Sequence, residues 1–160
     1  MTFDNSRTII SLRIKLFFAT VILLAYLGVV YVAKIVKFPL LGFSDTLWTV
    51  VLVTIYLIIV FLPMVRNFQF VAFSDEEDSI VFKYFFAGMV GGKKNSVSIK
   101  KKLFTGYKTE SKYLGLSVSI ILFQKMGQGI AKYPPIYISA LTKEQKDKMF
   151  RALSKYTPKV

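Results

Sequence analysis

The sequence predicts a two-helix transmembrane hairpin followed by a mainly-β domain that ends in one helix. Three observations predict it: two uncharged apolar runs before residue 66, short alternating apolar segments after it, and a helical pattern near the C-terminus. Hydrophobic residues make up 54% of the 160 residues, and the mean hydropathy is +0.50. These values are high for a soluble domain of this size and are typical of membrane proteins.

The first apolar run extends from Leu16 to Ala33 without a charge. As a helix it covers roughly 27 Å, which is close to the thickness of the hydrocarbon core of a bilayer. The second run, residues 46–64, is apolar on every side, whereas a helix of a globular protein shows a polar stripe. We therefore expect spans at about 16–36 and 46–65, within a hairpin that covers residues 16–66. A cleaved signal peptide does not fit the first run, because its apolar stretch is too long and no small-residue cleavage pattern precedes Lys34.

The loop between the runs contains Pro39 and Gly42, which stop a helix and permit a reversal. Tyr31 and Trp48 flank this loop, and such rings prefer the headgroup level of a membrane. Basic residues number four at the outer ends of the hairpin and two in the loop: Arg7, Arg13, Lys15 and Arg66 against Lys34 and Lys37. This bias places both termini in the cytoplasm, with residues 1–15 as a cytoplasmic N-terminal segment.

Residues 67–160 have a different pattern, in which apolar residues alternate. We expect strands at 68–74, 79–86, 96–100, 114–123 and 135–139, all rich in β-branched and aromatic residues. The acidic segment 74–78 and the glycines at 88, 91 and 92 supply turns between them. The acidic segment lacks the ligand order of a calcium loop, so we interpret it as an exposed turn that faces away from any anionic surface.

The last part of the chain predicts a helix over 142–156, ahead of Pro158. Thr142 and Gln145 have the spacing of a capping box. An apolar stripe is expected to pack on the sheet, and it comprises Met149, Phe150, Leu153 and Tyr156. Lysines are expected on the solvent face of this helix: Lys143, Lys146, Lys148 and Lys155.

Residues 113–156 combine the strand IILFQK, a glycine-containing loop, YPPIYIS and ALTKEQKDKMFRAL, with a P-I-x-I-S-x-L-[ST] run at 135–142. This order resembles the bacterial pleckstrin-homology-like family, including the YcxB-like C-terminal domains that follow two membrane spans. The resemblance covers the arrangement of the whole chain and individual residues only in the last third. It implies a pleckstrin-homology-like barrel over 67–160 with a C-terminal capping helix, and a place in the bacterial inner membrane. It implies no settled activity, because fold is not function.

The basic stretch 90–102 is the candidate binding site. On a strand with period two, Ser96, Ser98, Lys100 and Lys102 share one face, while Val97, Ile99 and Leu103 face the core. We expect an anionic-surface site formed by Lys93, Lys94, Lys100 and Lys102, with Lys101 on the opposite face. The first strand follows Arg66 almost at once, so the domain is held near the bilayer, where each Lys contributes on the order of 1 kcal/mol of attraction.

Other readings of the basic stretch remain open. A solvated face, or a membrane protein partner, accounts for the same lysines. Nucleic acid is disfavoured, although Phe104, Tyr107 and Tyr113 interleave the charge, because aromatics in alternating strands are more often core and no known nucleic-acid motif is present. The glycine pairs do not have the context of a phosphate-binding loop.

Enzyme chemistry is not expected. The chain has no Cys and no His, which excludes thiolate metal sites and the usual nucleophile pairs. We expect no catalytic residue, no metal site and no cofactor. The predicted function is non-catalytic binding at the membrane surface, either to anionic lipid or to a membrane protein partner. The alternative is a structural or assembly subunit of a larger membrane complex. Thr20, Thr49 and Thr54 suit helix packing in a protein of either kind, so they do not separate the two functions.

Overall fold

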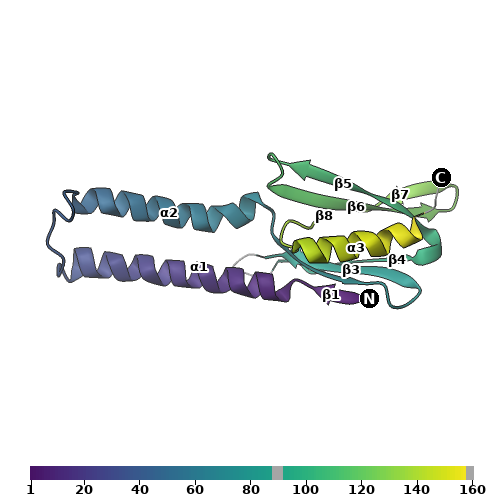
Figure 1. The fold of residues 1–160 in the computed structure, drawn as a ribbon, viewed down its shortest axis with the longest axis horizontal. Helices are drawn as coiled ribbons and strands as arrows, with labels where there is room; N and C mark the ends of the chain where they lie inside the picture. The colour runs from purple at the N-terminus through teal and green to yellow at the C-terminus, as the bar shows by residue number, and fades with distance from the viewer. Residues whose placement is uncertain (88–91, 158–160) are drawn as a thin grey trace. The chain divides into compact units, whose positions relative to one another are not determined.

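A computed structural model describes residues 1–87 and 92–157 (Figure 1). The turn expected at Gly88 and Gly91 lies outside the described residues. The chain divides into two units, which are described separately. A β unit combines Met1–Ile10 with Val65–Val160, and a helical unit covers Ser11–Met64.

The helical unit is built from two long apolar helices (Figure 1). Helix α1 covers Ser6–Leu27 and continues as a π-helical turn over Gly28–Val32, and α2 covers Asp45–Val65. Both are long and apolar enough to cross a membrane. The first helix therefore starts well before the expected boundary at residue 16 and ends before residue 36.

Tyrosine and threonine side chains join the two helices of this unit. The Thr20 and Tyr56 hydroxyl oxygens are 3.2 Å apart, and Thr49 Oγ1 is 3.1 Å from the Tyr26 hydroxyl and 2.7 Å from that of Tyr31. Thr54 is different, since its hydroxyl donates to the Val50 carbonyl of its own helix. The pairing of the hairpin thus includes two of the three threonines expected to pack helices.

The β unit contains two antiparallel sheets (Figure 1). The first has the order β1-β2-β3-β4, with β1 at Thr2–Asp4, β2 at Gln69–Ser74, β3 at Ser79–Phe86 and β4 at Asn95–Lys100. After a 3₁₀ turn at Lys101–Leu103, the second sheet contains β5 (Phe104–Lys112), β6 (Ser117–Met126), β7 (Gly129–Lys132) and β8 (Ile136–Tyr137), with β5, β7 and β8 all paired to β6. Helix α3 (Lys143–Tyr156) is the last element of the chain. The expected layout of two apolar helices, a β region and a C-terminal helix is confirmed.

The alternating pattern of the sequence is reproduced in the core. Alternate residues of β2 and β3 are fully buried, among them Phe73, Ile80 and Phe82. Thr142 and Gln145 form the expected capping box of α3, and Met149 and Leu153 of its stripe are fully buried against the sheets. Phe150 stacks on Tyr107 with ring centroids 5.5 Å apart. The prediction that Lys146 lies on the solvent face of α3 is wrong, because this side chain is half-buried.

The first residues of the chain belong to the β unit: Met1–Ile10 join Val65–Val160, whereas the sequence predicts a cytoplasmic N-terminal segment at 1–15 and a β domain that begins at residue 67. Strand β1 pairs with β2, and the Asn5 side chain, 1% exposed, donates to the Gln69 carbonyl at 2.9 Å and accepts from the Val71 amide at 2.8 Å. The Asp4 carboxylate accepts hydrogen bonds from Ser6, and these hold the pKa of Asp4 below its ordinary value. The β unit therefore includes both segments that flank the hairpin in sequence.

Candidate functional site

The four lysines of the expected site do not form one rim. Strand β4 ends at Lys100, and Lys102 lies in the following 3₁₀ turn rather than on the strand face of Ser96 and Ser98. Lys93 and Lys94 precede the strand, so Lys94 and Lys100 are separated by about 20 Å along it. All four side chains are exposed. The strand thus divides the expected site into two pairs at opposite ends of the β unit.

The pairing registers define these two ends. The linker end comprises Arg66–Gln69, Gly92–Asn95 and Lys112–Ser117. Gln69 pairs with Phe86 there, Asn95 pairs with Tyr84, and Asn67 hydrogen-bonds to Ser117 at 3.2 Å. The acidic end comprises Ser74–Ser79, Lys100–Leu103 and Met126–Gly129, where Ser79 pairs with Lys100. Lys93 and Lys94 lie at the linker end, and Lys100 and Lys102 lie at the acidic end.

At the acidic end, lysine and acid contact each other. Lys101 Nζ donates to the Asp75 carbonyl oxygen at 2.7 Å and lies 5.0 Å from the centroid of the Tyr156 ring. The Tyr156 hydroxyl donates to the Asp75 carboxylate at 3.4 Å. Asp75 therefore departs from the expectation of a wholly exposed turn, because only 9% of its side chain is accessible, whereas Glu76, Glu77 and Asp78 are exposed. The inward placement of Lys101 agrees with the sequence, although it results from the 3₁₀ turn and not from strand register.

The linker end has a different charge environment. Its three segments contribute Arg66, Lys93, Lys94 and Lys112, and no carboxylate. Lys146 of α3 adds a fifth positive charge to this end. Its pKa is lowered, first by burial and further by the nearby charge of Arg66. Within the described residues, none of these five cations has a charged nitrogen within 4.0 Å of a carboxylate oxygen. Positive charge thus gathers here without a neutralising partner.

Arg66 is the least satisfied of these groups. Its Nε is buried and has no hydrogen-bond partner among residues 1–87 and 92–157, and its guanidinium lies 5.3 Å from the centroid of the Phe68 ring. A buried guanidinium N–H without a partner is costly. In the sequence, Arg66 is visible only as a charge that flanks the second span, and Lys146 is expected on the solvent face of its helix. The proximity of Arg66 and Lys146 is not visible in the sequence, because they are eighty positions apart in the chain and come near each other only when α3 packs on the sheets.

The turn between β5 and β6 is the other prominent feature of the linker end. A strand was expected at 114–123, but β6 begins at Ser117, and Tyr113, Leu114 and Leu116 are exposed in the turn. Of the aromatics weighed as stacking platforms, Phe104 is buried and Tyr107 packs on the core. Tyr113 alone of the three is exposed. The linker end therefore carries exposed apolar side chains as well as positive charge.

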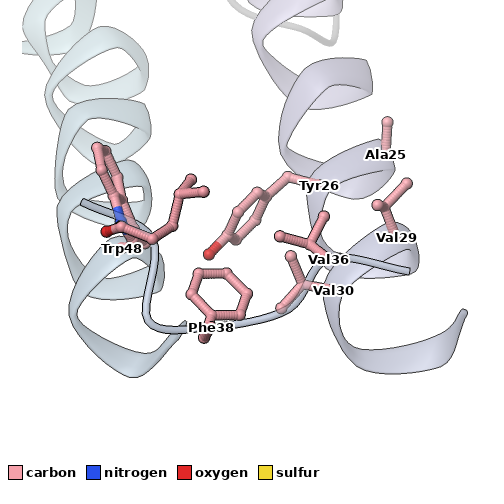
Figure 2. A pocket seen from close by; sticks show the side chains of 8 residues that line it. Ala25, Tyr26, Val29, Val30, Val36, Phe38 and Trp48 are labelled. Carbon is pink, nitrogen blue, oxygen red and sulfur yellow. The ribbon is translucent and has the colours of Figure 1, made fainter. Parts of the chain in front are cut away.

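The cavities of the helical unit offer little chemistry. Figure 2 shows one of about 370 Å³, into which the Tyr26 ring reaches from α1, with Phe38 of the connecting loop and Trp48 of α2 around it. The Tyr26 hydroxyl already bonds to Thr49, and the other lining side chains are apolar apart from the Trp48 N–H, which donates to the Leu40 carbonyl. Among residues 1–87 and 92–157, no cluster of acids suited to a metal ion occurs.

Comparisons with known proteins give no relative: no family model, no curated protein and no solved structure matches the chain.

Proposed function

We propose that this chain is an integral protein of the bacterial inner membrane whose pleckstrin-homology-like β unit lies in the cytoplasm and binds the anionic membrane surface through its linker end. In this proposal α1 and α2 are the membrane anchor, both termini are cytoplasmic, and the β unit binds without catalysing a reaction. The observation that carries the proposal is that Arg66, Lys93, Lys94 and Lys146 gather at the end where the chain leaves α2, with no carboxylate partner in the part of the chain that the structure describes.

Two observations support the membrane anchor: the properties of the two helices, and the two chain segments that together form the β unit. Both helices meet the length and hydropathy of a span. Because Met1–Ile10 and Val65–Val160 form one compact unit, two spanning helices require both flanking segments to lie on the same side of the membrane. The basic bias of the outer ends then favours the cytoplasmic side.

A pleckstrin-homology-like fold is supported by the element order. Two antiparallel sheets are followed by one helix whose apolar stripe is buried in their common core, as the resemblance implies. In this arrangement the hairpin is an insertion between β1 and β2 rather than a segment placed before the domain.

Covalent reach supports lipid as the binding partner. Only Arg66, Asn67 and Phe68 separate α2 from β2. Since a residue spans at most about 3.6 Å, Gln69 lies within roughly 14 Å of the last residue of α2. Cations this close to an anionic leaflet are within or near the Debye length of about 8 Å at physiological salt. Tethering also supplies a high local concentration, so weak contacts are occupied.

Phosphate chemistry suits Arg66 in particular. A guanidinium presents a planar fork of donors that matches a phosphate group, and it is more weakly hydrated than an ammonium group. A lipid phosphate beside Arg66 and Lys146 would offset the repulsion between the two cations. The same chemistry would also hold free inorganic phosphate, so the test must separate the two sources.

The experiment uses the full chain, since β1 is part of the β unit. The protein is reconstituted in nanodiscs that contain spin-labelled phosphatidylglycerol or phosphatidylcholine, and electron paramagnetic resonance measures the motionally restricted fraction of each. We expect a preference for phosphatidylglycerol that falls as salt rises. Inorganic phosphate is added in a separate arm, where competition at millimolar concentration would identify a free-phosphate site instead.

Matched double variants locate the binding end. Lys93→Gln with Lys94→Gln should weaken the preference by about 5-fold for each lysine near the surface, equivalent to on the order of 1 kcal/mol each. Lys100→Gln with Lys102→Gln removes the same charge from the acidic end and should leave the preference unchanged. Equal effects of the two pairs would reject the linker end as the site. Loss of all lipid preference together with a stoichiometric co-purifying protein would favour the assembly-subunit function.

A further inference from the structure

The tip of the β5–β6 turn exposes three large apolar side chains in succession around a glycine. Leu114 is fully exposed, at 107% of its reference accessibility, Tyr113 is 62% exposed and Leu116 is 41% exposed. Exposed apolar residues occur singly on most proteins, but a contiguous group at a projecting tip indicates a contact surface. Lys112, also exposed, precedes the group.

The backbone of this turn is unusual for its sequence. Tyr113 and Leu114 have φ angles of 52° and 54°, and Gly115 follows at 91°. The left-handed region suits glycine and is costly for bulky side chains, so this turn is not one that tyrosine and leucine adopt by local preference. The Leu116 amide donates to the Tyr113 carbonyl at 3.1 Å and closes the turn. The side chains are thereby held outward in a conformation whose cost a binding partner would offset.

The base of the turn is hydrogen-bonded to the short segment that follows α2 in the chain. The Asn67 side-chain amide donates to the Ser117 hydroxyl at 3.2 Å, and Ser117 is 1% exposed. Asn67 follows Val65, the last residue of α2, after a single residue. The turn therefore belongs to the part of the β unit that is tethered closest to the apolar helix.

We propose that the turn Tyr113–Leu116 inserts into the interfacial region of the bilayer beside the second span. Leu114 and Leu116 would enter the boundary of the acyl chains, the Tyr113 ring would lie at the headgroup level, and Lys112 would remain among the phosphates. This inference rests on the proposed membrane anchor and goes beyond the proposed electrostatic binding, since its driving force is apolar burial.

The surroundings favour lipid over a protein partner as the occupant. The order of lysine, tyrosine and leucine along the tip matches the change from headgroups to acyl chains across an interface. Asn67 lies two residues after the end of α2 and hydrogen-bonds to Ser117 at the base of this turn, so every copy of an anchored protein holds the tip near the bilayer, whereas a protein partner would have to be recruited.

The absence of cysteine makes a site-specific test direct. Leu114→Cys and Gln128→Cys are each labelled with an environment-sensitive nitrobenzoxadiazole group in the full chain and reconstituted in nanodiscs. Gln128 is the matched control because it is exposed in the turn at the other end of β6. We expect several-fold stronger quenching of the Leu114 label than of the Gln128 label by lipids with a nitroxide near the headgroup end of the acyl chain, and the opposite order for aqueous iodide.

The lipid composition separates this inference from the proposed function. Insertion should persist in pure phosphatidylcholine and at high salt, whereas the phosphatidylglycerol preference should not. A Leu114 label that iodide reaches as freely as the Gln128 label, in a protein that keeps its phosphatidylglycerol preference, would overturn the insertion and leave the proposed function standing. Insertion without any lipid preference would retain this inference and reject the electrostatic one. Normal amide-exchange protection of β5 and β6 in both labelled proteins shows that each variant is folded.

Discussion

The two ends of the β unit carry similar numbers of lysines and differ in what those lysines meet. At the acidic end Lys101 is engaged by the Asp75 carbonyl and the Tyr156 ring, and four acids lie in the neighbouring turn. At the linker end the charge of Arg66 is near enough to Lys146 to lower its pKa, and the three segments that form this end bring no carboxylate. The difference teaches that a run of lysines in a sequence is not by itself a site. Strand β4 separates Lys93 and Lys94 from Lys100–Lys102, and of the latter three Lys101 is held by contacts within the β unit.

Both ends of the β unit depend on α3, which packs on both sheets. A substitution in the buried face of this helix is therefore expected to give the largest loss of stability. Leu153→Asp would place a charge at a fully buried position and should destabilise the β unit by more than about 4 kcal/mol. Amide hydrogen exchange of β2 and β3, measured by mass spectrometry on the full chain in detergent, reports the loss. Lys143→Asp, at an exposed position of the same helix, is the control, and equal protection in the two variants would show that α3 is not docked.

The next largest effect concerns the linker end. Asn5→Ala removes the partners of the buried Gln69 carbonyl and Val71 amide, which should cost about 2–4 kcal/mol. Faster amide exchange in β2 would be the readout. Asn95→Ala removes the same side chain from an exposed position of this end and should change exchange little. If Asn5→Ala were equally silent, β1 would not be held to the β unit.

Lys101→Met tests the acidic end. It removes a charged donor and a cation over Tyr156, and the methionine retains part of the packing, so we expect a loss of about 1–2 kcal/mol. The neighbouring exposed Lys100→Met should stay within about 0.5 kcal/mol of the parent. Denaturant unfolding of the β unit, followed by tyrosine fluorescence, compares them. A larger effect at Lys100 would reverse the structural assignment of the two lysines.

The smallest effect is expected at Lys146, and it depends on pH. Burial and Arg66 lower the pKa of Lys146 in the folded protein, so the folded state holds this proton less tightly than the unfolded chain. Lys146→Gln should therefore be as stable as the parent or slightly more stable at pH 8, by at most about 0.5 kcal/mol. The parent should gain on the variant as pH rises from the folded pKa toward the ordinary lysine value near 10.4.

Thermal unfolding of both proteins in detergent from pH 8 to pH 10.5 measures this difference. Lys143→Gln, at an exposed position one turn earlier, supplies the control. A parent that loses stability relative to Lys146→Gln over the same range would contradict the lowered pKa. Added anionic detergent should reduce the difference if an anion lies between Lys146 and Arg66.

Local sequence patterns were sufficient for the elements with a regular period. The capping box at Thr142 and Gln145 and the stripe through Leu153 predicted α3, and alternation predicted β2 and β3. Strand β5 was missed because its second half, KTESK, is polar on both faces and shows no alternation. Strand β1 was missed because three residues ahead of a helix carry no period, and its strand conformation comes from pairing with β2.

The candidate site was predicted only in part, for the same reason. The basic character near β4 was visible in the sequence, and Lys93 and Lys94 remain candidate residues. Lys100 and Lys102 were grouped with them because a strict strand period was extended through the 3₁₀ turn at Lys101–Leu103. Leu114 was expected within a strand because its side chain is apolar, and the left-handed backbone that places it at a tip has no local signature in YLGL.

The sequence by itself determined two apolar helices, an alternating β region with a closing helix, and an excess of positive charge, because each of these depends on composition or on a period within a few residues. Tertiary structure decided that Met1–Ile10 joins the β unit, that one lysine stretch is divided between two ends, and that Arg66 lies near Lys146. These features depend on how distant segments of the chain pair, as Asn5 does with Gln69, 64 residues away. Such pairings are selected by burial of the common core, to which no single segment of the sequence contributes enough to reveal its partner.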